Sequence, residues 1–119
     1  MEEENVLTGN KLIAEFMNLG IQLHMVEHPI SGEYIDIEDL EYHESWDWLM
    51  PVVDNIDSIE VNGDTFAIDM FQTGCQVFRY RMYNGEIITT EGVNRLDATY
   101  KAVIEFIKWY NKNKDESST

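Results

Sequence analysis

Two Asn-Gly dipeptides, at 62–63 and 84–85, constrain the fold of this chain more than any other feature. Apolar residues recur at alternate positions in the neighbouring stretches 65–71 and 75–83, and 86–90 follows the second dipeptide. Alternation with a period of two is typical of half-buried strands. An Asn-Gly pair between such stretches is typical of a two-residue hairpin turn, because both turn residues need a positive φ. The sequence therefore predicts an antiparallel meander in the middle of the chain.

Three other segments have the apolar spacing of amphipathic helices: 10–19, 45–57 and 95–110. Gly20 follows the first, and glycine often ends a helix because it adopts a left-handed conformation without a Cβ clash. Pro51 interrupts the second, whose apolar stripe continues past it, so we expect a kink there. Asn94 precedes the third as an N-cap, with Asp97 three residues later.

The remaining segments complete a prediction of one domain, 1–119. Residues 21–27 alternate like a single half-buried strand, and 34–38 alternate like a return strand. Residues 111–119 are polar and without periodicity, as in a disordered tail. We predict an α+β fold, with a mostly antiparallel sheet of about four or five strands and three helices packed on one of its faces.

Composition excludes several classes of function. The chain has 119 residues, with 8 Lys and Arg against 23 Asp and Glu, and a net charge of −15. Such a charge disfavours direct binding to nucleic acid, which requires cations against the phosphates, and docking on anionic membranes. The longest apolar run, 48–53, is far too short to span a membrane. Cys75 is the single cysteine and the N-terminus is acidic, so we expect a reducing, cytoplasmic location.

The charge is unevenly distributed. Between Lys11 and Arg79 the sequence has no Lys or Arg, and its densest acidic run is 33–47. One interpretation is an acidic surface with aromatic anchors that docks on a basic protein, for example by imitating the phosphates of a nucleic acid. The alternative is a solvated surface that only keeps the protein soluble. The predicted partner-binding residues are Glu33, Asp36, Glu38, Asp39, Glu41, Glu44, Asp47 and Trp48.

Two groups of residues suggest metal binding. His24 and His28 fit the H-x-x-E-H pattern of one class of zinc peptidase, but on a strand their side chains are too far apart for one metal. His43 lies among carboxylates, and we expect it to be solvated. The second group consists of acidic residues whose spacing differs from that of a calcium loop. They are Asp54, Asp57, Glu60 and Asp64.

No motif indicates a catalytic site. Cys75 has no activating base nearby in the sequence, so we expect an inert thiol. The chain has no Gly-rich phosphate loop, no G-x-S-x-G and no C-x-x-C, and we expect no cofactor. Of Trp46 and Trp48, two positions apart on a helix, one is expected in the core and the other at the surface or over the edge of the sheet.

Three segments, 10–17, 42–53 and 98–111, together resemble a family of short, acidic, uncharacterised proteins of bacteriophage and related bacterial genomes. The most distinctive parts read SWDWLMPVV and YKAVIEFIKWYN, and the three segments cover about a third of the chain. The resemblance implies a shared helical framework and a phage origin, with a host or phage component as the target. It implies no activity, cofactor or catalytic residue.

The sequence thus predicts a non-enzymatic acidic module that binds a basic protein, with inhibition of a nucleic-acid-binding protein by charge mimicry as one form of that function. The first alternative is a small metal-binding protein or metal-dependent enzyme that uses His24, His28 and His43. The second is a structural or assembly component that works in an oligomer. The sequence does not determine the oligomeric state.

Overall fold

The computed structural model describes residues 3–17, 21–22, 25–27, 31–61, 63–80 and 85–117, and it has an α+β fold. Its helices are α1 (Glu3–Phe16), α2 (Trp46–Ser58) and α3 (Arg95–Ser117), with a short 3-10 helix, η1 (Ile37–Asp39). Within these described residues the strands form two separate three-stranded antiparallel sheets. The prediction of an α+β fold with antiparallel strands is confirmed, whereas the single larger sheet is replaced by two small ones.

The larger sheet is the predicted meander. It contains β4 (Thr65–Met70), β5 (Gly74–Tyr80) and β6 (Gly85–Glu91) in that order. Val61 and Asp64 exchange backbone hydrogen bonds of 2.9 Å across the first Asn-Gly pair, and Gly63 has a φ of 86°. That turn is therefore confirmed. It connects the two residues of an isolated β-bridge, Val61 and Asp64, rather than two strands. The second turn includes Asn84, which lies outside the described residues.

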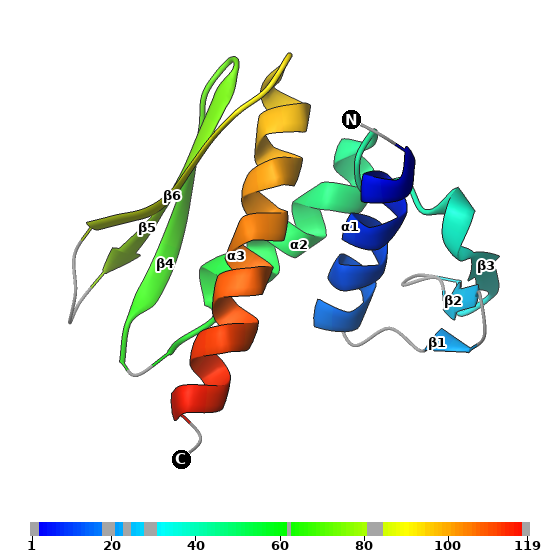
Figure 1. Cartoon of the computed structure of the whole chain (residues 1–119), viewed down its shortest axis with the longest axis horizontal. Coiled ribbons are helices and arrows are strands. Elements are labelled where there is room, and N and C mark those ends of the chain that lie inside the picture. Colours follow the sequence, from blue (N-terminus) through cyan, green and yellow to red (C-terminus); the bar gives the residue numbers. More distant parts are fainter. Residues whose placement is uncertain are drawn as a thin grey trace.

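One face of this sheet is covered by α2 and α3 (Figure 1). The side chains between the layers are apolar and largely aromatic. Phe66 of β4 meets Phe106 of α3 at a ring distance of 5.1 Å and Trp109 at 5.4 Å. Phe66, Phe106 and Val77 are buried. This layer is part of the hydrophobic core of the molecule, which continues to Ile13 of α1.

Helix α1 packs on α3, on the side away from the larger sheet (Figure 1). Phe16 lies edge-on to Phe106 at 6.4 Å and to Tyr110 at 5.6 Å. The prediction of three helices on one face is therefore corrected, because two helices cover the sheet and the third covers α3.

The smaller sheet lies beside α1, at the opposite end of the molecule from the larger sheet (Figure 1). Its strands are β1 (Ile21–Gln22), β2 (Met25–Glu27) and β3 (Tyr34–Asp36). The prediction of one strand over 21–27 is wrong, because Ile21–Gln22 and Met25–Glu27 are two strands that pair with each other in antiparallel order. The return strand is confirmed over 34–36, where it pairs with β2, and is followed by η1.

The helix limits agree in part with those expected. α2 runs through Pro51, which is exposed, and follows Ser45 in the extended conformation of an N-cap. α3 begins after Asn94, whose Oδ1 accepts the N–H of Asp97 at 2.8 Å. This confirms the predicted cap, in which a side-chain oxygen satisfies an unpaired N–H of the first turn. α3 continues to Ser117, so most of the segment expected to be a disordered tail is helical.

Helix α1 starts at Glu3, well before the expected start near Asn10. Gly9 therefore lies inside a helix, where glycine is normally unfavourable. A Cβ at Gly9 would overlap the hydroxyl of Tyr100, so the missing side chain is what allows α1 to approach α3. Gly20, the expected end signal, lies outside the described residues.

Candidate functional site

The acidic segment, which we define as residues 33–47, runs along β3, η1 and the first turn of α2. All of the carboxylates predicted from the sequence are exposed on it: Glu33, Asp36, Glu38, Asp39, Glu41, Glu44 and Asp47. Asp36 accepts the N–H of Glu38 at 3.0 Å, which links the end of β3 to η1. The predicted acidic residues are therefore all exposed along one segment of the chain.

Two buried side chains attach this segment to the helices. Leu40 and Tyr42 are each only 2% exposed, and the exposed Glu41 lies between them. Burial raises the pKa of Tyr42 to about 12, because the phenolate form is poorly solvated there. Trp48 lies edge-on to Tyr42 at 5.3 Å and is partly buried. Trp48 thus packs on an anchor of the segment and is not a fully exposed contact residue.

Trp46 is also partly buried and packs against the hydrophobic core. The expectation of one core and one surface tryptophan is therefore replaced by two partly buried side chains. Both contribute to the packing that supports the start of α2.

A buried polar network fixes the segment further. The side-chain amide of Asn10, on α1, donates to the carbonyl of Leu40 at 3.1 Å and lies 3.2 Å from Nδ1 of His43. The hydroxyl of Tyr100, on α3, donates to Oδ1 of Asn10 at 3.0 Å. Asn10 and Tyr100 are almost fully buried, and burial raises the pKa of the Tyr100 hydroxyl. Hydrogen bonds of this kind specify a position, because an unsatisfied buried polar group is costly.

The role of Asn10 could not be predicted from the sequence. Its partners are 30 and 90 residues away in the chain, and no local pattern relates them. His43 was expected to be solvated, but its side chain is half-buried, with Nε2 3.7 Å from Glu44. Its ring also lies edge-on to that of Tyr100 at 6.1 Å. His43 is therefore part of the attachment of the segment.

The metal-binding alternative has no support in the described residues, where no group of three or more His, Cys, Asp or Glu side chains is placed to hold a metal. His24 and His28 lie outside the described residues. Asp64 is buried and pairs with Arg79 at 2.6 Å, unlike its exposed neighbours in the sequence, Asp54, Asp57 and Glu60.

Arg79 also lies over the ring of Trp109, 5.2 Å from its centroid. Asp64 therefore takes part in packing β5 against α3 rather than in a cation loop. Cys75 is fully buried, and burial raises the pKa of its thiol, which agrees with the expectation of an inert cysteine.

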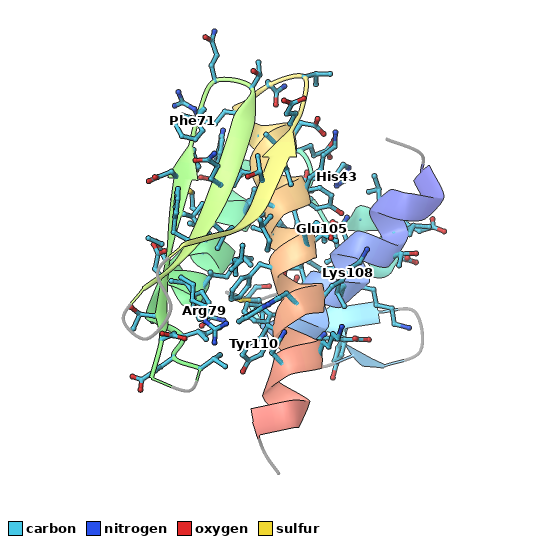
Figure 2. The ribbon with its side chains drawn as sticks, turned by 60° about the vertical axis from the view of Figure 1, so that its left-hand side comes forward. His43, Phe71, Arg79, Glu105, Lys108 and Tyr110 are labelled. Atoms are coloured by element: carbon cyan, nitrogen blue, oxygen red, sulfur yellow. The ribbon has the colours of Figure 1, made fainter. Side chains whose placement is uncertain are left out.

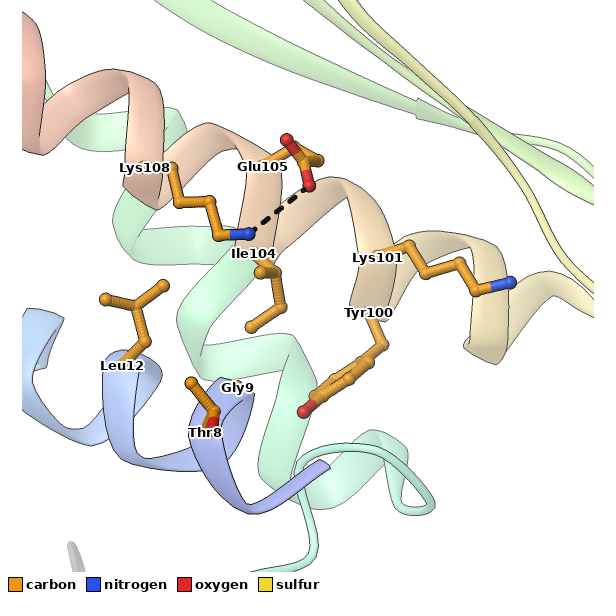
Figure 3. Close-up of a pocket in the computed structure, with 8 residues that line it drawn as sticks. All are labelled: Thr8, Gly9, Leu12, Tyr100, Lys101, Ile104, Glu105 and Lys108. Carbon is orange, nitrogen blue, oxygen red and sulfur yellow. Dashed lines mark ion pairs between the residues drawn. The ribbon is translucent and has the colours of Figure 1, made fainter. Parts of the chain in front are cut away.

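A second surface feature is a groove of about 410 Å³ between α1 and α3. Its floor is formed by Leu12, Ile104 and the ring of Tyr100 (Figure 3). Glu105 and Lys108 of α3, which are labelled in Figure 2, also line the groove. The other lining residues are Thr8, Gly9 and Lys101.

Comparison with known proteins gives no match: no family model, no curated protein sequence and no solved structure is similar to this chain. The resemblance to short phage proteins therefore stays a prediction. None of the helices in the described part of the chain is both long enough and apolar enough to cross a membrane.

Proposed function

We propose that this protein is a non-enzymatic binding module that docks on a basic protein through the acidic segment. One observation supports this most strongly: exposed carboxylates lie on a segment in which Leu40 and Tyr42 are buried, and the carbonyl of Leu40 accepts a hydrogen bond from Asn10 of α1. A surface that only maintains solubility does not need charges at defined positions. A docking surface benefits from them, because little conformational entropy is then lost on binding.

The charge pattern defines the class of partner. A surface with seven carboxylates and, between Lys11 and Arg79, no Lys or Arg in the sequence attracts a cationic surface and repels nucleic acid. Such complementarity raises association rates and makes binding sensitive to salt. The proposed partner is a basic protein, including one that binds nucleic acid and whose site the acidic segment would occupy by charge mimicry. The proposed setting is the cytoplasm, with a host or phage protein as the target.

The test compares two variants of equal charge. Glu38→Gln, Asp39→Asn, Glu41→Gln and Glu44→Gln together neutralise the acidic segment. The control neutralises exposed acids elsewhere, with Asp54→Asn, Glu60→Gln, Asp69→Asn and Glu91→Gln. Each set removes four negative charges and changes the net charge from −15 to −11.

Tagged wild type and both variants are used to capture proteins from a host lysate at low and then high salt. We expect wild type and control to retain the same basic protein and release it at high salt, because exposed charges are screened over about 3 Å at 1 M. The segment variant should not retain it, and calorimetry with the purified partner should give the same order. Equal retention by all three proteins would refute the proposed surface.

A further inference from the structure

The groove between α1 and α3 is not part of the surface proposed to dock on a basic protein. That surface is acidic, whereas the floor of the groove is apolar. Leu12, Ile104 and the ring of Tyr100 give it an apolar floor. Its volume of about 410 Å³ is large enough to accept an aromatic side chain together with its neighbours.

Lys101 and Lys108 give the rim of this groove a positive charge. Of the two, Lys108 is the one that can change its ion-pair partner. Nζ of Lys108 lies 3.7 Å from Glu105, and the two side chains are 61% and 54% exposed. Such exposed pairs are weak, so Lys108 is able to exchange Glu105 for another carboxylate. Lys101 is held more firmly, with Nζ 3.1 Å from Asp97 and 3.2 Å from the carbonyl of Glu91.

The same chain carries a surface of complementary chemistry. Tyr34 is 47% exposed, which makes it one of the most exposed large apolar side chains among the described residues. It lies on β3, at the edge of the smaller sheet, close to the exposed carboxylates of Glu33 and Asp36. An aromatic ring with flanking carboxylates matches an apolar groove with a lysine at its rim.

Helix α1 connects these two surfaces. Thr8 and Leu12 line the groove, while Asn10 holds the acidic segment. A chain that carries both halves of a complementary contact is able to form a two-fold dimer, in which each copy offers both halves. We infer that the groove is a docking site for Tyr34, Glu33 and Asp36 of a second copy of this chain.

Long-range repulsion between two copies of charge −15 opposes this contact at low salt. The Debye length at physiological salt is about 8 Å, which is shorter than the smallest dimension of the molecule, 24 Å. Local contacts therefore decide association at physiological salt, and the measurement is made there.

Sedimentation equilibrium over a wide range of concentration is the test. The wild type is expected to pass from 13.9 kDa to twice that mass as its concentration rises. Lys108→Glu and the pair Glu33→Lys with Asp36→Lys should each raise the dissociation constant by about tenfold or more, because like charges then face each other. Mixing the two variants should restore the dimer, since each new contact again joins opposite charges.

Lys112→Glu is the matched control, because Lys112 is exposed on the same helix, does not line the groove and undergoes the same charge change. It should leave the dimer unchanged. Tyr34→Ala, which alters no charge, should weaken the dimer through loss of the aromatic anchor. Circular dichroism checks that every variant is folded.

The inference is overturned if the wild type stays at the monomer mass throughout, if Lys108→Glu has no more effect than Lys112→Glu, or if the mixture does not restore the dimer. It goes beyond docking on a basic protein, although both contacts use the acidic segment. Lys108→Glu leaves that segment intact, so capture of a basic partner by this variant shows which of the two proposals has failed.

Discussion

The larger sheet and the acidic segment are attached to the helices by different means. Strands β4–β6 lie on α2 and α3 through apolar and aromatic side chains such as Phe66, Phe106 and Trp109. The acidic segment is held by two buried side chains and by hydrogen bonds from Asn10.

The reason for this difference lies in what each region is able to bury. A sheet face with apolar side chains at alternate positions is stabilised by the area it removes from water. A segment rich in exposed carboxylates has little such area, so directional hydrogen bonds define its place. The larger sheet should therefore determine global stability, and the polar network should determine the order of the acidic surface.

Removing core volume should give the largest effect. Phe106 is fully buried, and Phe106→Ala should lower the free energy of unfolding by about 3–5 kcal/mol through lost burial and a cavity. Urea denaturation followed by tryptophan fluorescence measures this change. Val93→Ala is the control, because Val93 is 85% exposed and its truncation should change stability by no more than about 0.5 kcal/mol. A similar loss in both variants would contradict the assignment of the core.

Breaking the polar network should give a smaller and more local effect. Asn10→Ala removes the amide bonded to Leu40 and His43, at a cost of about 1–3 kcal/mol. Hydrogen exchange should accelerate at the backbone amides of 38–44 while β4–β6 stays protected. Asn55→Ala is the control, because the amide of Asn55 donates to a weak acceptor, Sδ of Met17, at 3.3 Å. Uniform acceleration over the whole chain would remove the distinction between the two regions.

We expect a pH-dependent contribution to stability from the N-terminal cap of α3, the helix that contacts both regions. Burial alone would raise the pKa of Asp97, but the N–H of Val93 and the ammonium of Lys101 lower it below its ordinary value. A carboxyl with a lowered folded pKa stabilises the protein above its unfolded value of about 3.9, and this contribution is lost as pH falls through the folded pKa. Asp97→Asn should cost about 1 kcal/mol at pH 7. The difference from wild type should shrink on acidification, and a difference that does not vary with pH would exclude this origin.

The smallest effect is expected at the end of α2. Partial burial, and then the nearby charge of Asp54, raise the pKa of Asp57. Its carboxyl therefore favours folding below the unfolded value of about 3.9 and ceases to do so as pH rises through the folded pKa. Asp57→Asn should stabilise the protein at pH 7 by less than about 0.5 kcal/mol, because surface changes are small. Thermal unfolding at pH 7 and pH 3 should show the gain only at the higher pH.

Several local features could be predicted because neighbouring residues cause them. The cap of α3 depends on Asn94 and Asp97, three residues apart, and the turn at Gly63 depends on a positive φ. The limits of α2 follow from an apolar stripe within one segment. Exposure of the acidic segment could be predicted as well, since carboxylates stay in water unless they are paired. Asp64 departs from that rule because Arg79, fifteen residues away, pairs with it.

The sequence by itself determined the class of fold, the meander and the position of the acidic surface, all of which depend on short-range periodicity and charge. The tertiary structure alone decided that the strands form two sheets and that α1 packs on α3. It also decided that Gly9 lies inside α1 against Tyr100, and that Asn10 holds the acidic segment. The contacts of α1 with α3 and with the acidic segment join residues 30 to 94 positions apart. Their energies depend on which surfaces meet after the chain has folded, and no local pattern in the sequence encodes that meeting.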